Sequence, residues 1–115
     1  MVIYTNFVKW ITGGFAIGIT IWPFILIVPK HRGNKVLLNH EKIHLEQQKE
    51  LWIFGFLYLY VYHYLKNLVI GFFKGKGWNH KWAYRQIPFE KEAYDNEEDL
   101  AYLEDRDFKA YKEYV

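Results

Sequence analysis

Residues 35 to 53 alternate polar and apolar side chains at the period of an α-helix, and this pattern constrains the fold more than any other in the chain. One stripe is charged or polar and consists of Lys35, Asn39, Lys42, Glu46, Lys49 and Glu50. The opposite stripe consists of Leu37, His40, Glu41, His44, Leu45, Gln48, Leu51 and Trp52. Asn34 precedes the pattern and can cap the helix. The sequence therefore predicts an amphipathic helix whose inward face carries two imidazoles and a carboxylate.

The inward face contains the sequence His40-Glu41-Lys42-Ile43-His44. On a helix, residues four apart lie one above the other, so both imidazoles can converge on one metal ion. Glu41 then lies beside the ion, where it can take a proton from water. The alternative is that the histidines are ordinary helix residues held by hydrogen bonds. Because two buried imidazoles and a carboxylate are costly without partners, we favour a metal site.

The chain of 115 residues suits one domain, residues 1–115. Residues 10 to 29 are apolar and contain glycines, Pro23 and many β-branched residues. Glycine and proline disfavour a helix in water, whereas β-branched residues favour strands. We expect a β-hairpin that turns near Trp22-Pro23, with a transmembrane helix as the alternative.

A second apolar segment covers residues 51 to 73, and Gly55 can bend the chain there. We expect a second helix from residue 56 to 73. Its tyrosines alternate in the middle of the segment, at Tyr58, Tyr60, Tyr62 and Tyr64. Tyrosine in a membrane instead concentrates at the two interfaces. The helix is therefore expected to be buried in protein or to lie at a bilayer surface, rather than to cross a bilayer.

Residues 74 to 82 contain glycines and are expected to form a connection. Pro88 suits the first turn of a third helix, which is expected to run from residue 88 to 103. This helix is strongly acidic, and its carboxylates are the natural source of a third metal ligand. The predicted fold class is thus mainly α (α+β): a helical domain with a short N-terminal hairpin.

The chain resembles the gluzincin metallopeptidases, in which a Glu from a later helix completes a zinc site begun by His-Glu-x-x-His. In several of those families the ligand opens a Glu-x-Glu-Ala pattern, and residues 90 to 93 read Glu-Lys-Glu-Ala. The resemblance thus implies a zincin-like fold with zinc on His40, His44 and Glu90; Glu92 is the rival ligand. The chain is also similar to short bacterial proteins that join "NHEKIHLxQQxE" to "YRxIxFExEAY". Membrane-type gluzincins often carry an Asp four residues after the ligand Glu, where this chain has Tyr94.

A metallohydrolase also benefits from a group that stabilises the developing oxyanion. His80, Tyr84 and Arg85 precede the third helix and are candidates. Arg85 has an alternative role, which is to hold the acidic helix in place.

The site residues and the resemblance together predict a zinc-dependent hydrolase of peptide bonds, with Glu41 as general base. The alternatives are a non-catalytic zinc-binding structural domain and a membrane-associated interaction protein. The chain has no cysteine, which excludes thiolate ligands and a Cys nucleophile. The net charge is only +2 and the basic residues do not form one block, which argues against nucleic acid as a partner. The expected partners are a peptide or protein substrate and a membrane surface, in a cytoplasmic or membrane-associated setting.

Overall fold

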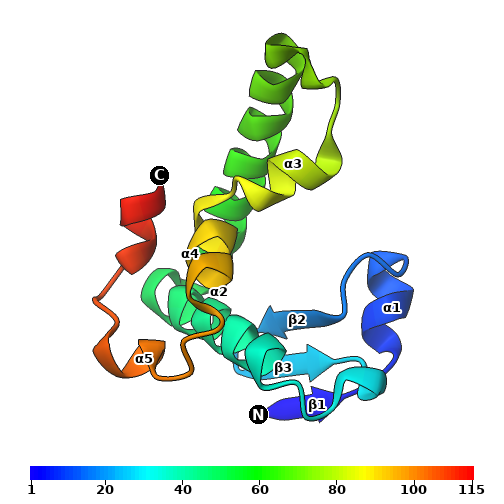
Figure 1. Ribbon diagram of the computed structural model, residues 1–115, viewed down its shortest axis with the longest axis vertical. Coiled ribbons are helices and arrows are strands. Elements are labelled where there is room, and N and C mark those ends of the chain that lie inside the picture. Colours follow the sequence, from blue (N-terminus) through cyan, green and yellow to red (C-terminus); the bar gives the residue numbers. More distant parts are fainter.

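The structure is a computed structural model that describes residues 1–115, and it is mainly helical with a small sheet near the N-terminus (Figure 1). The predicted α+β class is confirmed. The elements in chain order are β1 (Val2–Tyr4), α1 (Phe7–Thr12), β2 (Gly18–Ile21), β3 (Phe24–Ile27), η1 (Pro29–His31), α2 (Lys35–Gly71), η2 (Phe72–Lys76), α3 (His80–Arg85), α4 (Pro88–Asn96), α5 (Tyr102–Asp105) and η3 (Ala110–Tyr114).

The predicted hairpin is present as β2 and β3, which pair antiparallel and turn at a cis Trp22-Pro23 peptide bond. The transmembrane alternative for residues 10 to 29 is therefore wrong. A third strand, β1, pairs parallel to β3, so the strand order is β1-β3-β2. Neither β1 nor α1 was expected, because both are too short to show a hydrophobic period and β1 depends on a distant partner.

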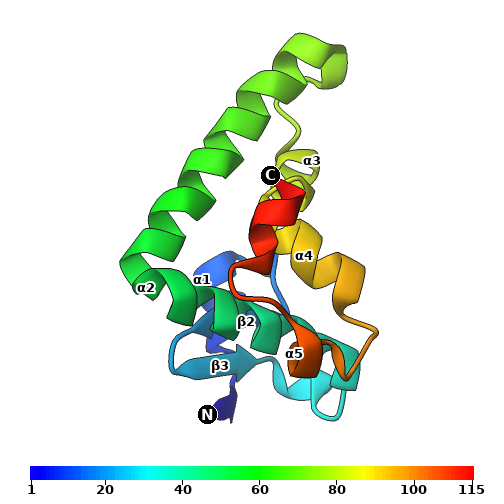
Figure 2. The same cartoon turned by 90° about the vertical axis from the view of Figure 1, so that its left-hand side faces the viewer.

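Helix α2 contains both helices that the sequence predicts for residues 35 to 73, joined at a sharp bend. The bend lies at Trp52, whose backbone (φ 61°, ψ 159°) is not helical. Figure 2 shows the first half running along the sheet and the second half leaving at a steep angle. The cap is also as predicted, because the side chain of Asn34 accepts a hydrogen bond from the backbone N–H of Leu37.

One side of the second half of α2 packs against α3. The first three residues of α3 fall in the segment from 74 to 82, which was expected to be a connection and not a helix. The side chain of Asn79 caps α3 by accepting a hydrogen bond from the N–H of Trp82. At Gly71 an added Cβ would lie 3.1 Å from ring atoms of Trp82, so glycine lets this pair approach closely. A hydrophobic cluster joins the second half of α2 to α4 and the C-terminal segment, and it consists of Phe56, Ile87, Phe89 and Tyr111.

Helix α4 begins at Pro88 as expected but ends at Asn96, well before residue 103. The reason is a tertiary contact: the side-chain N–H₂ of Asn39 donates to the carbonyl oxygens of Glu97 and Asp99 at 2.8 and 3.0 Å. Asn39, placed on the outer stripe from the sequence, is in fact buried. This contact satisfies carbonyls after the helix end and ties α4 to the first half of α2.

Candidate metal centre

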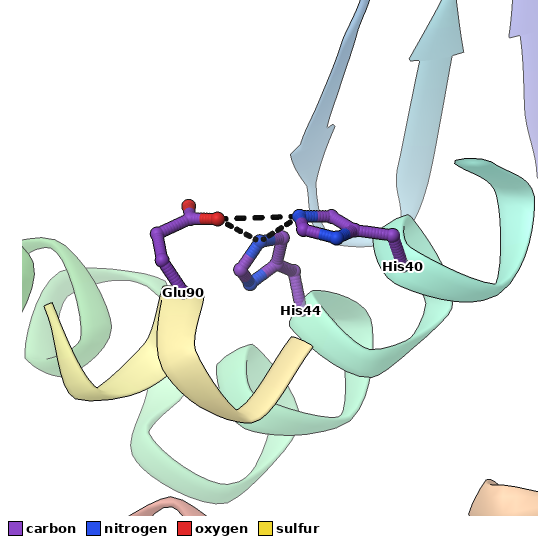
Figure 3. A group of neighbouring side chains, drawn as sticks. All are labelled: His40, His44 and Glu90. Carbon is purple, nitrogen blue, oxygen red and sulfur yellow. Dashed lines mark hydrogen bonds and ion pairs between the residues drawn. The ribbon is translucent and has the colours of Figure 1, made fainter. Parts of the chain in front are cut away.

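Three buried side chains converge between α2 and α4 (Figure 3). His40 and His44 project from successive turns of α2, and their Nε2 atoms lie 3.1 Å apart. Glu90, from the first turn of α4, places Oε1 3.2 Å from both nitrogens. All three residues are at most 6% exposed. The sequence prediction that the two histidines face the interior is confirmed.

The position of Glu90 follows from the start of α4. Pro88 occupies the first turn and Phe89 is buried in the core, which sets the rotation of the helix. The second carboxylate oxygen of Glu90 accepts a hydrogen bond of 2.8 Å from the hydroxyl of Tyr60, in the second half of α2. Burial and Glu90 raise the pKa of Tyr60, so this hydroxyl keeps its proton and remains a donor. Both halves of α2 therefore orient the same carboxylate.

The tautomer of His44 is set by Gln47. The amide nitrogen of Gln47 donates to the carbonyl oxygen of Phe89 at 3.1 Å and to Oε1 of Glu92 at 2.9 Å. These two acceptors fix the amide orientation, so the amide oxygen faces Nδ1 of His44, 2.8 Å away. Since that oxygen can only accept, Nδ1 carries the proton. The Nε2 atom is then the nitrogen that can bind an ion, and it points at His40 and Glu90.

His40 has different surroundings. Its ring lies edge-on to Tyr94 of α4, with ring centroids 4.6 Å apart. Its Nδ1 atom lies 3.8 Å from a carboxylate oxygen of Glu97, at the end of the same helix. Tyr94 stands where membrane-type gluzincins often carry an Asp, and the carboxylate nearest to Nδ1 of His40 here is that of Glu97.

Glu41 lies next to this cluster and is 4% exposed. The hydroxyl of Thr20, in β2, donates to the backbone oxygen of Glu41 at 3.0 Å and lies 3.5 Å from its carboxylate. At Gly18, also in β2, an added Cβ would lie 3.3 Å from Cγ of Glu41, so a larger residue there would press on the carboxylate stem. Strand β2 thus holds Glu41 in place from the side opposite α4.

The site contains no lysine or arginine to pair with its carboxylates. Glu41 and Glu90 are buried, yet no lysine or arginine forms an ion pair with either. Burial raises the pKa of Glu41, against the opposing effect of His44 and His40. Burial alone would lower the pKa of His44, but the adjacent Glu90 carboxylate raises it to about 9. Burial alone would raise the pKa of Glu90, but His44 and hydrogen bonds from both histidines hold it well below its usual range.

This donor set fits a metal ion. Two imidazole nitrogens and one carboxylate oxygen lie within 4.8 Å of one another, each with a lone pair that can be directed inward. Nitrogen and carboxylate ligands of this kind suit zinc, and three protein ligands are typical of catalytic zinc sites. A divalent cation would also balance the charges of Glu41 and Glu90. His40, His44 and Glu90 therefore form a group that could hold a metal ion.

The site borders a cavity of about 510 Å³. Glu41, His44 and Glu90 contribute to its wall, and most of the remaining wall is apolar. Strand β2 contributes Ile19 and Ile21, and the second half of α2 contributes Leu57 and Val61. This cavity, which we call the cleft, has a volume within the range of small-molecule sites.

The other residues expected at the site are distributed between two places. His80 and Tyr84 line the cleft, as Glu90 does. His80 contacts the hydroxyl of Tyr64 through Nδ1. Arg85 does not line the cleft: its guanidinium carbon lies 3.7 Å from the ring centroid of Tyr94, in a separate hollow. This placement against α4 suits the alternative role of holding the acidic helix.

Glu92, the rival ligand, points away from the two histidines. It binds Arg106 and accepts a hydrogen bond of 2.7 Å from the hydroxyl of Tyr102. Arg106 also binds Glu50 at 2.7 Å, so Glu50 is covered rather than exposed, contrary to its assignment to the charged stripe. The structure places Glu90, and not Glu92, against His40 and His44.

Gln47 and Tyr60 orient the ligands, a role that the sequence analysis assigned to neither. Gln47 lies three residues after His44 and so shares its helix face, which was an available signal. Tyr60 is one of several alternating tyrosines, and its role depends on the bend at Trp52. Gln48 instead binds β2, since its amide accepts from the N–H of Trp22 at 2.6 Å and donates to the oxygen of Thr20 at 2.7 Å.

Comparisons with family models, with curated proteins and with solved structures find no match to this chain. The resemblance to gluzincins therefore depends on the residues of the site alone, and the site is interpreted from its own geometry.

Proposed function

We propose that the protein is a zinc-dependent hydrolase that cleaves peptide bonds. The observation that carries this proposal is the buried group of His40, His44 and Glu90 with the buried carboxylate of Glu41 beside it. Glu41, His44 and Glu90 also line the cleft. When bound, a zinc ion supplies Lewis acidity, which activates water and polarises a carbonyl group.

The residues of the chain have distinct roles in this proposal. His40, His44 and Glu90 hold the ion, while Gln47 and Tyr60 orient His44 and Glu90. Glu41 accepts a proton from water and returns it to the leaving amine. Its pKa is raised by burial, which makes the carboxylate a better proton acceptor than an exposed one.

The cleft supports an enzyme over a purely structural metal site. A structural zinc site is closed by protein ligands, whereas this group has three and borders an open cavity. His80 and Tyr84 line the same cavity and are the candidates to stabilise a developing oxyanion. Tyr84 keeps its proton, since burial raises its pKa, and it can therefore donate.

The test is Glu41→Gln, which is nearly isosteric but cannot accept the proton. We expect the variant to keep its zinc and its fold. Its rate of hydrolysis of a broad peptide mixture, measured by mass spectrometry of the products, should fall by about 10²–10⁴-fold. Glu46→Gln is the matched control, because Glu46 lies on the exposed face of the same helix and pairs with Lys49. Equal cleavage by Glu41→Gln and wild type would rule out Glu41 as the base. Silence of zinc-loaded wild type across the mixture would favour the structural alternative.

A further inference from the structure

The second half of α2 exposes an apolar stripe along its full length. Phe54, Tyr58, Val61, Leu65, Val69 and Phe73 recur at helical spacing and are all exposed; Phe73 lies in η2, which continues α2. Phe54 and Phe73 are exposed by 85% and 81%. Figure 2 shows α3 along one side of this helix and no other element along the opposite side. We call the six residues the outer face.

A face of this kind marks an interaction surface rather than an ordinary protein exterior. A soluble helix directs its apolar stripe at the core, yet this helix has a second, exposed apolar stripe in addition to Phe56, which it buries in the core. Polar groups also fix its contact with α3. Tyr64 binds His80, and the side chain of Asn67 donates to the carbonyl oxygen of Ala83 at 3.1 Å. By length and composition alone, the helix from Lys35 to Lys76 is the one helix that is long and apolar enough to cross a membrane. Few residues of its apolar part are buried inside the protein. Its exposed apolar stripe suits a helix that lies in a bilayer surface.

Charge identifies the partner more narrowly. All 13 acidic residues lie within residues 41–50 and 90–113. Residues 51–89, which include the outer face and α3, contain no acidic residue. Their basic residues are Lys66, Lys74, Lys76, Lys81 and Arg85. Lys74 and Lys76 lie beside Phe73 and the exposed Trp78, at the far end of the helix. Apolar and aromatic side chains next to lysines match a surface of lipid tails and anionic headgroups.

We propose that the outer face of α2 rests on an anionic lipid bilayer, with Lys74 and Lys76 contacting its headgroups. The proposal does not depend on the metal chemistry. It has a consequence for the site, because Val61 belongs to the outer face and also lines the cleft. Under the function proposed above, the cleft would therefore open at the bilayer surface, where apolar peptide segments gather.

The test is flotation of the full-length protein with vesicles of phosphatidylcholine alone or mixed with phosphatidylglycerol. We expect wild type to float with the mixed vesicles and to be released in part by high salt, because salt screens the lysines. Leu65→Asp and Phe73→Asp should each lower partitioning by about tenfold or more, since each removes an apolar side chain that would enter the bilayer and adds a charge of the same sign as the headgroups. Lys74→Gln with Lys76→Gln should reduce the preference for mixed vesicles.

The matched control is Phe108→Asp, because Phe108 is 74% exposed but lies in the acidic C-terminal part of the chain. It should float like wild type, and so should His44→Ala, which separates this proposal from the metal site. Wild type that stays unbound with both vesicles overturns the proposal, as does an equal loss in Phe108→Asp. A lipid-free dimer that Leu65→Asp dissociates, with no vesicle binding by wild type, would show instead that a second copy covers the outer face.

Discussion

The side-chain oxygen of Gln47 lies 2.8 Å from Nδ1 of His44 and thereby determines which imidazole nitrogen can bind a metal ion. The same amide reaches Phe89 and Glu92 of α4, so the helix that carries Glu90 also sets the tautomer of a histidine on α2. The contact between α2 and α4 thus positions both the ligand Glu90 and Gln47, the residue that orients His44. Partners of this kind typically affect metal affinity nearly as much as the ligands do.

Replacement of Gln47 should therefore weaken zinc binding without removing a ligand. We expect Gln47→Leu to raise the dissociation constant for zinc by about 10–100-fold, measured by competition with a chromogenic chelator. Gln48→Leu is the control, because the Gln48 amide hydrogen-bonds to the backbone of Thr20 and Trp22 and to neither histidine. That variant should lower the free energy of unfolding by about 1–3 kcal/mol yet keep its zinc affinity. Equal zinc affinities in the two variants would show that Gln47 does not orient His44.

Glu90 and Glu92 should respond differently to the same substitution. Glu90→Gln removes the only carboxylate in contact with both histidines and should lose most of the bound zinc. Glu92→Gln leaves the three ligands but breaks half of the Arg106 ion-pair cluster, so it should lower the free energy of unfolding by up to about 3 kcal/mol. Zinc content and thermal unfolding of both variants are the measurements. Loss of zinc from Glu92→Gln with retention in Glu90→Gln would mean that Glu92 is the ligand.

Zinc affinity should rise with pH. The raised pKa of His44, about 9 in the metal-free site, means that its Nε2 holds a proton at neutral pH. An ion must displace this proton, so the apparent affinity should increase by about tenfold per pH unit between about pH 6 and 8. The measurement is the zinc dissociation constant across that range, with proton release followed in buffers of different ionisation enthalpy. A constant affinity with no proton release would contradict the account of His44.

The parts of the fold that were predicted are those that depend on neighbours in the sequence. The 3.6-residue period of residues 35–53 depends on local contacts, so it placed His40, Glu41 and His44 on one buried face before any tertiary structure was known. The hairpin at Trp22-Pro23 is local for the same reason. The proximity of Glu90 to the histidines, in contrast, came from a resemblance and not from a physical derivation.

The parts that were missed depend on contacts between distant segments. The end of α4 at Asn96 is set by Asn39, and the burial of Glu50 is set by Arg106. Both polar residues have helical positions typical of solvent exposure, and only the return of the C-terminal segment covers them. Strand β1 likewise forms because β3 offers an edge. No local pattern carries such information.

The central claim is that His40, His44 and Glu90 hold a zinc ion, and elemental analysis of the purified protein tests it most directly. We predict about one zinc per chain in wild type and far less in His44→Ala, with the helical circular dichroism spectrum retained in both. His63→Ala is the matched control, because His63 lies on α2 away from the cluster and should keep the full zinc content. Wild type without zinc after expression with the metal supplied, or His44→Ala with an unchanged stoichiometry, would contradict the account.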